Sequence, residues 1–206
     1  MTSRLFWGLV GLGALCATLA GFLLAAKIDS SRPVLASGTW LPAAKPIADF
    51  HLIDSQGRPV TRAALLGRPT LVYFGFTHCP DECPDTLAAL ARVTRQTALP
   101  GLQVLFVTVD PQRDTPTVLA GYLRHFDPSF LGLTGDPAEI GRLAATLGIS
   151  ISRLNLPGGG YDFDHTEAIL LFDSRAREVG VFTPPFDVRK LAQSLSRVAP
   201  ELRAAA

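Results

Sequence analysis

The chain has 206 residues, which suggests one globular domain with an appendage. Its 19 Lys and Arg residues nearly balance its 18 Asp and Glu residues, so the net charge of +1 gives no reason to expect a nucleic acid or another polyanion as a partner. Hydrophobic residues make up 48% of the chain, and the excess is concentrated at its amino-terminal end.

The first predicted element is an apolar segment from Leu5 to Ala26 that contains no charged residue. At 1.5 Å per helical residue it spans about 33 Å, enough to cross the roughly 30 Å hydrocarbon core of a bilayer. We therefore predict one transmembrane helix, a membrane anchor over residues 1–27. A cleaved signal peptide is the alternative, although its apolar core is usually shorter, about 7–15 residues.

Residues 28–45 are rich in Ser, Pro and Ala and show no periodicity, so we predict a linker there and a globular domain over residues 46–203. Arg4 before the apolar segment favours a cytoplasmic amino terminus. No targeting presequence precedes the anchor, and we therefore expect a bacterial inner membrane protein with its domain in the periplasm.

The first half of the domain has the pattern of a strand–helix–strand unit. Residues 49–69 alternate around a turn, as in a short β-hairpin. The apolar runs 70–76 and 102–110 are typical of strands buried on both faces. Residues 85–98, between these two runs, have helical spacing.

The second half begins with two predicted helices, for which Asp114 and Asp136 are the expected N-caps, each followed by a proline in the first turn. A short strand, an irregular loop, two strands and a final helix should follow, over residues 149–155, 156–165, 166–173, 177–183 and 187–202. This order predicts a three-layer α/β fold with a mixed central sheet. The loops after residues 76 and 110 should then meet at one sheet edge.

The sequence HCPDECPD, His78 to Asp85, follows the first buried strand and holds a pair of cysteines, Cys79 and Cys83. A proline inside a helix removes a backbone hydrogen bond, so we expect the next helix to begin at Pro84 with Cys83 as its N-cap. The helix amides and dipole should then lower the pKa of both thiols.

A metal site and a redox site both remain open for this pair. His165 precedes a buried strand, where thioredoxin-like folds carry a cis-proline, and it offers an imidazole next to the two thiolates. Two thiolates and one imidazole suit Cu(I) and keep Cu(II) accessible, whereas zinc would require a fourth ligand. Without a metal, Cys79 and Cys83 could form a structural disulfide or exchange disulfides with a partner.

Two further residues are candidates for a supporting role. Asp110 ends the second buried strand at the expected site and could form a turn, orient the site or contact a partner. His78 is adjacent to Cys79, and its side chain is expected to point away from the sulfur, so we predict that it supports the loop or the ligands instead of binding the metal.

Four segments in this order resemble the SCO/SenC copper chaperones, from about Pro46 to Pro200: FGFTHCPDECPDTL, VTVDPQRDTP, GYLRHFDPSFLGLTG and DHTEAILLFD. The resemblance implies a thioredoxin-like fold and copper bound by Cys79, Cys83 and His165, with Asp110 lining the site. It further implies a membrane-anchored metallochaperone that helps assemble the dinuclear copper centre of cytochrome c oxidase subunit II.

Under this reading the protein is not an enzyme with turnover, and its expected partners are subunit II, the membrane and another copper donor protein. The alternative is a thiol-disulfide oxidoreductase that keeps the cysteines of subunit II reduced. His165 separates these two functions, because copper binding uses an imidazole and disulfide exchange does not. A peroxidase has less support, since no Arg or Thr constellation for peroxide is evident near Cys79.

Overall fold

The computed structural model describes residue 7, residues 13–22 and residues 33–203. The chain separates into two compact units, residues 1–33 and residues 34–206. In the first unit, residues 13–22 are helical, and the described residues contain no helix that is long and apolar enough to cross a membrane. Much of the anchor predicted over residues 1–27, and the start of the predicted linker, lie outside the described residues.

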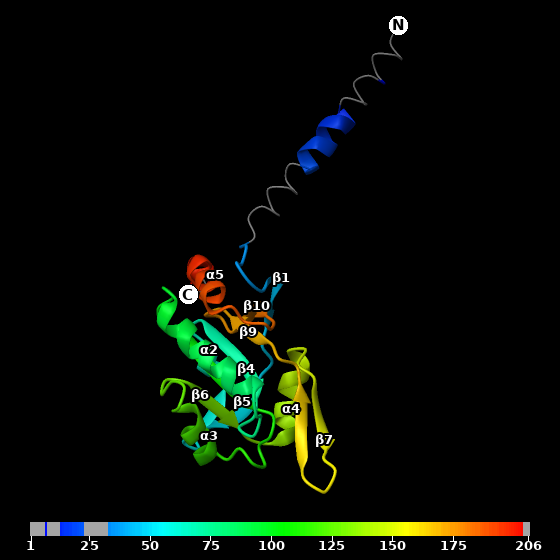
Figure 1. Cartoon of the computed structure of the whole chain (residues 1–206). Helices are drawn as coiled ribbons and strands as arrows, with labels where there is room; N and C mark the ends of the chain where they lie inside the picture. Colours follow the sequence, from blue (N-terminus) through cyan, green and yellow to red (C-terminus); the bar gives the residue numbers. More distant parts are fainter. Residues whose placement is uncertain (1–6, 8–12, 23–32, 204–206) are drawn as a thin grey trace. The chain divides into compact units, whose positions relative to one another are not determined.

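The second unit is built on one mixed sheet (Figure 1). Its strands are β1 (Thr39–Pro46), β2 (His51–Asp54), β3 (Pro59–Thr61), β4 (Thr70–Gly75), β5 (Gln103–Thr108), β6 (Leu131–Thr134), β9 (Ile169–Phe172) and β10 (Arg177–Phe182). Their order across the sheet is β1-β10-β9-β4-β5-β6-β2-β3. The pairs β4–β5 and β5–β6 are parallel, and the other pairs are antiparallel, which confirms the predicted mixed sheet.

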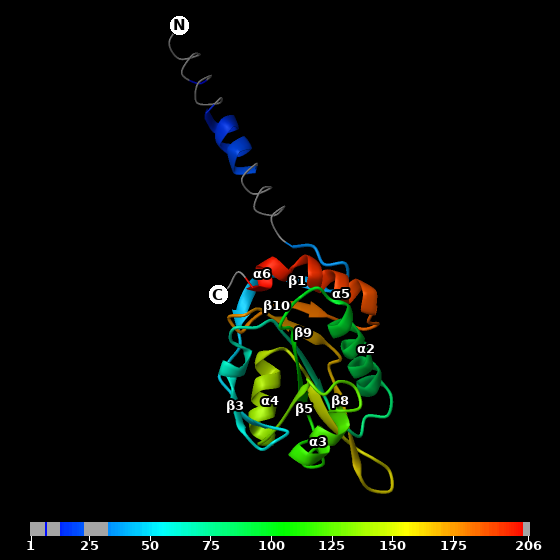
Figure 2. The same ribbon diagram turned by 90° about the vertical axis from the view of Figure 1, so that its left-hand side faces the viewer.

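Helices cover both faces of the sheet, and Figure 2 shows α2 and α4 on opposite sides of it. The helical segments are η1 (Arg62–Leu65, 3-10), α2 (Glu82–Gln96), α3 (Pro116–Leu123), α4 (Pro137–Thr146), α5 (Val188–Arg197) and α6 (Ala199–Arg203). This arrangement confirms the predicted three-layer α/β architecture.

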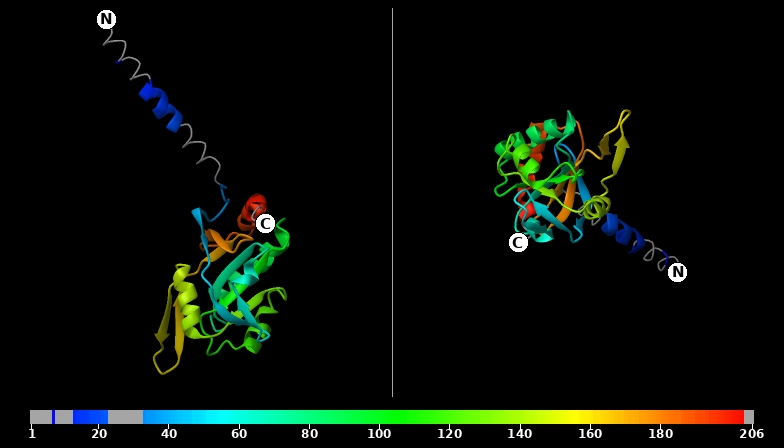
Figure 3. Two further views of the ribbon diagram at one scale, coloured as in Figure 1. Left: turned by 180° about the vertical axis from the view of Figure 1, so that it is seen from behind. Right: turned by 90° about the horizontal axis from the view of Figure 1, so that it is seen from below.

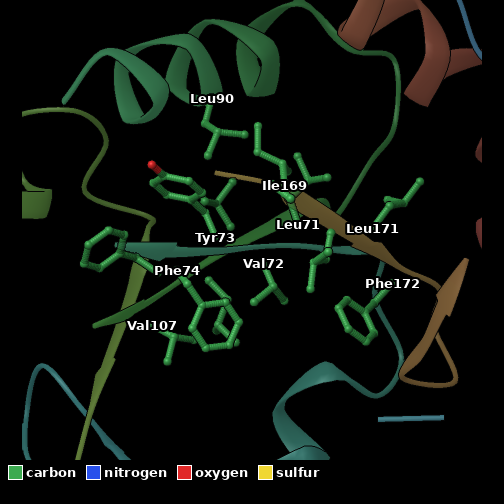
Figure 4. Close-up of a cluster of buried hydrophobic side chains, with 14 of the residues drawn as sticks. Leu71, Val72, Tyr73, Phe74, Leu90, Val107, Ile169, Leu171 and Phe172 are labelled. Carbon is green, nitrogen blue, oxygen red and sulfur yellow. The ribbon is translucent and has the colours of Figure 1, made fainter. Parts of the chain in front are cut away.

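Strand β4 lies at the centre of the sheet, and all six of its residues are buried. Leu71 and Tyr73 lie on the side of the sheet that faces Leu90 of α2, whereas Val72 points to the opposite face (Figure 4). Because helices cover both faces, an uninterrupted apolar run is the expected sequence for such a strand. The carboxyl end of β4 leads directly into the cysteine loop.

Two segments that the sequence predicts to be irregular are strands. Residues 39–45 lie in the predicted linker but belong to β1, which pairs with β10 at the edge of the sheet. Residues 161–165 form β8 (Tyr161–His165), which pairs with β7 (Ile151–Asn155) in a hairpin that stands away from the sheet (Figure 3). Three consecutive glycines, 158–160, take up positive φ angles and allow the tight turn between them.

Two predicted helix starts are wrong. Helix α2 begins at Glu82 with Asp81 as its N-cap, two residues before Pro84. Pro84 is tolerated there because the first four backbone N–H groups of a helix have no acceptor within the helix. Helix α3 is capped by Thr115, whose hydroxyl accepts from Val118 N, and not by Asp114, which turns into the protein. Capping of α4 by Asp136 is confirmed.

Candidate metal centre

The three predicted ligands lie together at the carboxyl end of β4. Cys79 is in the loop after β4 and is partly exposed, Cys83 is fully buried in the first turn of α2, and His165 is the last residue of β8. Cys83 Sγ lies 3.8 Å from His165 Nε2, and Cys79 Sγ accepts from the backbone N–H of Cys83 at 3.4 Å. Both cysteines are free thiols.

A cavity of about 250 Å³ opens over this cluster, and Cys79 and His165 both line it. The other lining residues are Phe76, Glu82, Leu154, Phe163, Asp164 and Glu167. Cys79 Sγ donates to Glu82 Oε2 at 3.5 Å. Within the described part of the chain, no three His, Cys, Asp or Glu side chains are close enough together to hold a metal ion. Binding of one ion by all three predicted ligands therefore requires a rearrangement of these side chains.

Two aromatic rings fix the position of the imidazole. The ring centroid of His165 lies 6.2 Å from that of Tyr73 and 6.0 Å from that of Phe76, and both contacts are edge-on. His165 Nδ1 is 3.2 Å from the carbonyl oxygen of Thr166. A proton on Nδ1 would be directed to that carbonyl and would leave Nε2, the nitrogen that faces Cys83, free to bind a metal.

Strand β4 also holds the sulfur of Cys83. The Tyr73 hydroxyl donates to Cys83 Sγ at 3.7 Å. A Cβ atom at Gly75 would lie 2.9 Å from Cys83 Sγ and 2.9 Å from the Phe106 ring, so only glycine leaves room for the sulfur there. The sequence identifies Tyr73 simply as a core residue, and its contact with the sulfur depends on the packing of α2 against β4.

Burial raises the pKa of the Cys83 thiol to about 12 and outweighs hydrogen bonding from the backbone of Phe76 and from Tyr73, which acts in the opposite direction. The prediction that the helix end lowers the pKa of both thiols is therefore wrong for Cys83. The helix dipole acts on a sulfur that has no contact with water, and desolvation of the thiolate dominates. In the metal-free protein Cys83 is a neutral thiol at pH 7.

The buried carboxylate of Asp114 joins the cysteine loop to β5. It accepts from Thr77 N at 3.0 Å and from Thr77 Oγ1 at 2.6 Å, two residues before Cys79. It also accepts from Thr108 Oγ1, at the end of β5, at 2.6 Å. A single carboxylate thus fixes the ends of the two central parallel strands relative to each other.

Asp110 is also buried, and its carboxylate connects the segment that follows β5 to the β7–β8 hairpin. Its carboxylate accepts from the Tyr161 hydroxyl at 3.1 Å and from Arg113 Nε. Arg113 Nη1 also donates to the Tyr161 carbonyl oxygen at 3.3 Å, and the guanidinium carbon of Arg113 lies 4.2 Å from the centre of the Tyr161 ring. Tyr161 is the first residue of β8 and His165 is the last, so these contacts hold the strand that carries the imidazole.

His78 lies on the outside of the loop. Its side chain is about half exposed, at 52%, and its Nδ1 is 3.1 Å from Thr77 Oγ1 and 3.9 Å from Asp114 Oδ1. The side chain is therefore directed to the Asp114 network that fixes the loop.

The sequence matches the SCO1/SenC family model over residues 41–200. It is 36% identical to the mitochondrial SCO2 homologue of Bos taurus, across 95% of this chain and 73% of that protein. The chain belongs to the SCO1/SenC family.

Solved Sco structures share the fold. ScoI of Bradyrhizobium japonicum, which has copper bound, is 38% identical with a TM-score of 0.68, covering 74% of this chain and 98% of that one. BsSco, a member of the Sco family of cytochrome c oxidase assembly proteins in which a disulfide switch was identified, has a TM-score of 0.64 at 17% identity, covering 82% and 99%. In the present chain, the thiolates of Cys79 and Cys83 would be soft donors that select Cu(I), and the imidazole of His165 is a donor that also suits copper.

Replacing Asp114 should destabilise the protein strongly. In Asp114→Ala, the Thr77 amide and the Thr77 and Thr108 hydroxyls lose their acceptor inside the protein. We expect the free energy of unfolding in urea to fall by about 2–4 kcal/mol. Asp81→Ala is the control, since Asp81 is exposed and makes no capping hydrogen bond, and it should change stability by less than about 0.5 kcal/mol. Equal effects of the two substitutions would argue against the role of Asp114.

The two thiols should differ in their rates of alkylation by iodoacetamide. The thiolate is the reacting form, and burial of Cys83 both blocks access and raises its pKa. In a Cys16→Ser background at pH 8, we expect Cys83 to react at least about a hundredfold more slowly than Cys79. Its rate should keep rising from pH 8 to pH 10, and the difference should disappear in urea. Similar rates in the folded protein would contradict the structure.

Proposed function

We propose that this Sco protein binds copper as cargo through Cys79, Cys83 and His165 and helps to assemble the dinuclear copper centre of cytochrome c oxidase subunit II. The contact between Cys83 Sγ and His165 Nε2, at 3.8 Å beside a cavity that Cys79 also lines, carries this proposal. The copper bound in the Bradyrhizobium japonicum relative supports the identity of the ion, and the assembly role of the family supports the partner.

The difference in exposure between the ligands suggests how the ion would be transferred. Cys79 faces the cavity, whereas Cys83 is fully buried. A thiolate of the partner could therefore replace Cys79 on the ion while Cys83 and His165 retain it, and two further exchanges would complete the transfer. Each exchange forms one copper–ligand bond and breaks another, so that the oxidation state is unchanged.

Negative charge at the cavity supports a cationic cargo. The carboxylates of Glu82, Asp164 and Glu167 line it together with Cys79 and His165. A cleft lined by one sign of charge concentrates counter-ions. Copper ions, or a donor protein with a basic surface around its own copper site, would be attracted to this opening.

Disulfide exchange is the second candidate function, and the same asymmetry of the thiols favours it. The accessible Cys79 would attack a disulfide of subunit II as a thiolate and release one partner thiol. Cys83, as a thiolate, would then attack the sulfur of Cys79 and release the second partner thiol, which leaves the partner reduced and Cys79 and Cys83 oxidised. The disulfide switch identified in BsSco is consistent with a disulfide between these positions.

The apolar segment from Leu5 to Ala26 supports a membrane-anchored protein. We place it in a bacterial inner membrane, with residues 34–206 in the periplasm. Membrane fractionation of the full chain, with and without residues 1–27, would test this location. Extraction of the full chain by alkaline carbonate would contradict an integral anchor.

Substituting His165 should separate the two functions. His165→Ala removes the imidazole and leaves both thiols, so we expect Cu(I) affinity to fall at least about a hundredfold. Formation of the Cys79–Cys83 disulfide should be retained. Competition with a Cu(I) chelator measures the first quantity, and mass spectrometry after thiol labelling measures the second. His78→Ala is the matched control and should bind Cu(I) as the unmodified protein does. Unchanged Cu(I) affinity in His165→Ala would refute the ligand assignment.

A further inference from the structure

The hydroxyl of Tyr73 is a polar group at the centre of the hydrophobic core. Tyr73 is fully buried in β4, and its side chain lies under α2 (Figure 4). Its hydroxyl donates to Cys83 Sγ at 3.7 Å. A buried tyrosine hydroxyl usually has a hydrogen-bond partner, because leaving it unpaired is costly. Thr86, one turn further along α2, is a second polar side chain that interacts with this hydroxyl.

The hydrogen bond from Tyr73 is made to Cys83, the most buried of the three predicted copper ligands. Cys83 has no exposed surface, so no water can donate a hydrogen bond to its sulfur. Its polar neighbours are the side chains of Cys79, Tyr73 and His165 and the backbone of Phe76. If Cys83 binds copper as a thiolate, the Tyr73 hydroxyl is the O–H donor already directed to that sulfur.

A hydrogen bond to a metal-bound thiolate changes the electronic properties of the metal. It withdraws electron density from sulfur and weakens sulfur donation to the ion. Cu(II) depends on this donation more than Cu(I), and hydrogen bonding around a cysteine sulfur is a known means of tuning the potential of copper sites. Such a bond therefore favours Cu(I) relative to Cu(II).

We infer that Tyr73 is a positioning residue that tunes the copper site, by donating a hydrogen bond to Cys83 Sγ and so favouring Cu(I). The inference rests on the proposed function, since it assumes that Cys83 binds copper. It explains why a tyrosine, and not a phenylalanine, occupies this core position. It also assigns to β4 an influence on the oxidation state of the cargo.

Tyr122 supplies a matched control for this inference. Its hydroxyl is also buried, and it has no hydrogen-bond partner among the described residues. The Tyr122 ring packs on the Phe106 ring, and their centroids are 6.2 Å apart. The centroid of the Phe106 ring is in turn 6.2 Å from that of the Tyr73 ring. Tyr122→Phe thus removes an equivalent oxygen from the same aromatic cluster without removing a hydrogen bond to sulfur.

The test compares Tyr73→Phe, Tyr122→Phe and the unmodified protein, each loaded with copper. The thiolate-to-Cu(II) charge-transfer band is measured by visible absorption, and the Cu(I) and Cu(II) affinities are measured by chelator competition. For Tyr73→Phe we expect the band to move to longer wavelength. The ratio of Cu(I) to Cu(II) affinity should fall about fivefold, as for the loss of one hydrogen bond. Tyr122→Phe should change neither quantity.

The possible failures can be told apart. If the unmodified protein binds no copper, the proposed function is wrong and this inference falls with it. If it binds copper but Tyr73→Phe leaves the band and the affinity ratio unchanged, only the role of Tyr73 is refuted. Equal shifts in Tyr73→Phe and Tyr122→Phe would also refute it, because a general loosening of the core would then be the cause. Thermal unfolding of each variant shows whether the core remains intact.

Discussion

The hydrogen bonds of the buried Asp114 carboxylate are the interaction on which the site depends most. Through Thr77 and Thr108 they tie together the ends of β4 and β5, where the cysteine loop begins. Four residues earlier, Asp110 holds Tyr161 at the start of β8. The segment from residue 110 to residue 114 therefore connects the cysteine loop to the strand that carries His165, although His165 comes 82 positions after Cys83 in the sequence.

The burial of Cys83 has consequences for both candidate functions. A neutral, enclosed thiol must lose its proton before it can bind a metal or attack a disulfide. The Cys83 thiolate is not stabilised by water. Binding of a cation in the cavity, or reaction with a disulfide at Cys79, would instead drive the loss of the Cys83 proton. Cys79, which is accessible, is thus expected to react first, and Cys83 second. The same order suits stepwise release of an ion to a partner and resolution of a mixed disulfide.

The sequence predicts well those elements whose buried apolar side chains recur at regular spacing. Strand β4 and the inner face of α2 are examples, because apolar spacing directly reflects which sides are covered. Strand β7 lies within the strand predicted over residues 149–155, but β8 falls in the segment predicted to be an irregular loop. Its first four residues alternate between aromatic and acidic side chains, yet the three glycines directly before it have the pattern of a loop. The inward turn of Asp114 could not be predicted either, since it depends on Thr77, which is 37 residues away. A carboxylate before Thr-Pro has the pattern of an N-cap, and only the fold reveals the competing donors.

The same limits apply to the candidate site. The spacing of Cys79 and Cys83, and the position of His165 before a buried strand, predict that these residues lie near one another, but they do not show that Cys83 is enclosed. The most direct measurement is an anaerobic titration of the reduced protein with Cu(I), followed by X-ray absorption at the copper edge. We expect copper bound by two sulfur atoms and one nitrogen atom. Four sulfur ligands, or no bound copper, would contradict the assignment of Cys79, Cys83 and His165.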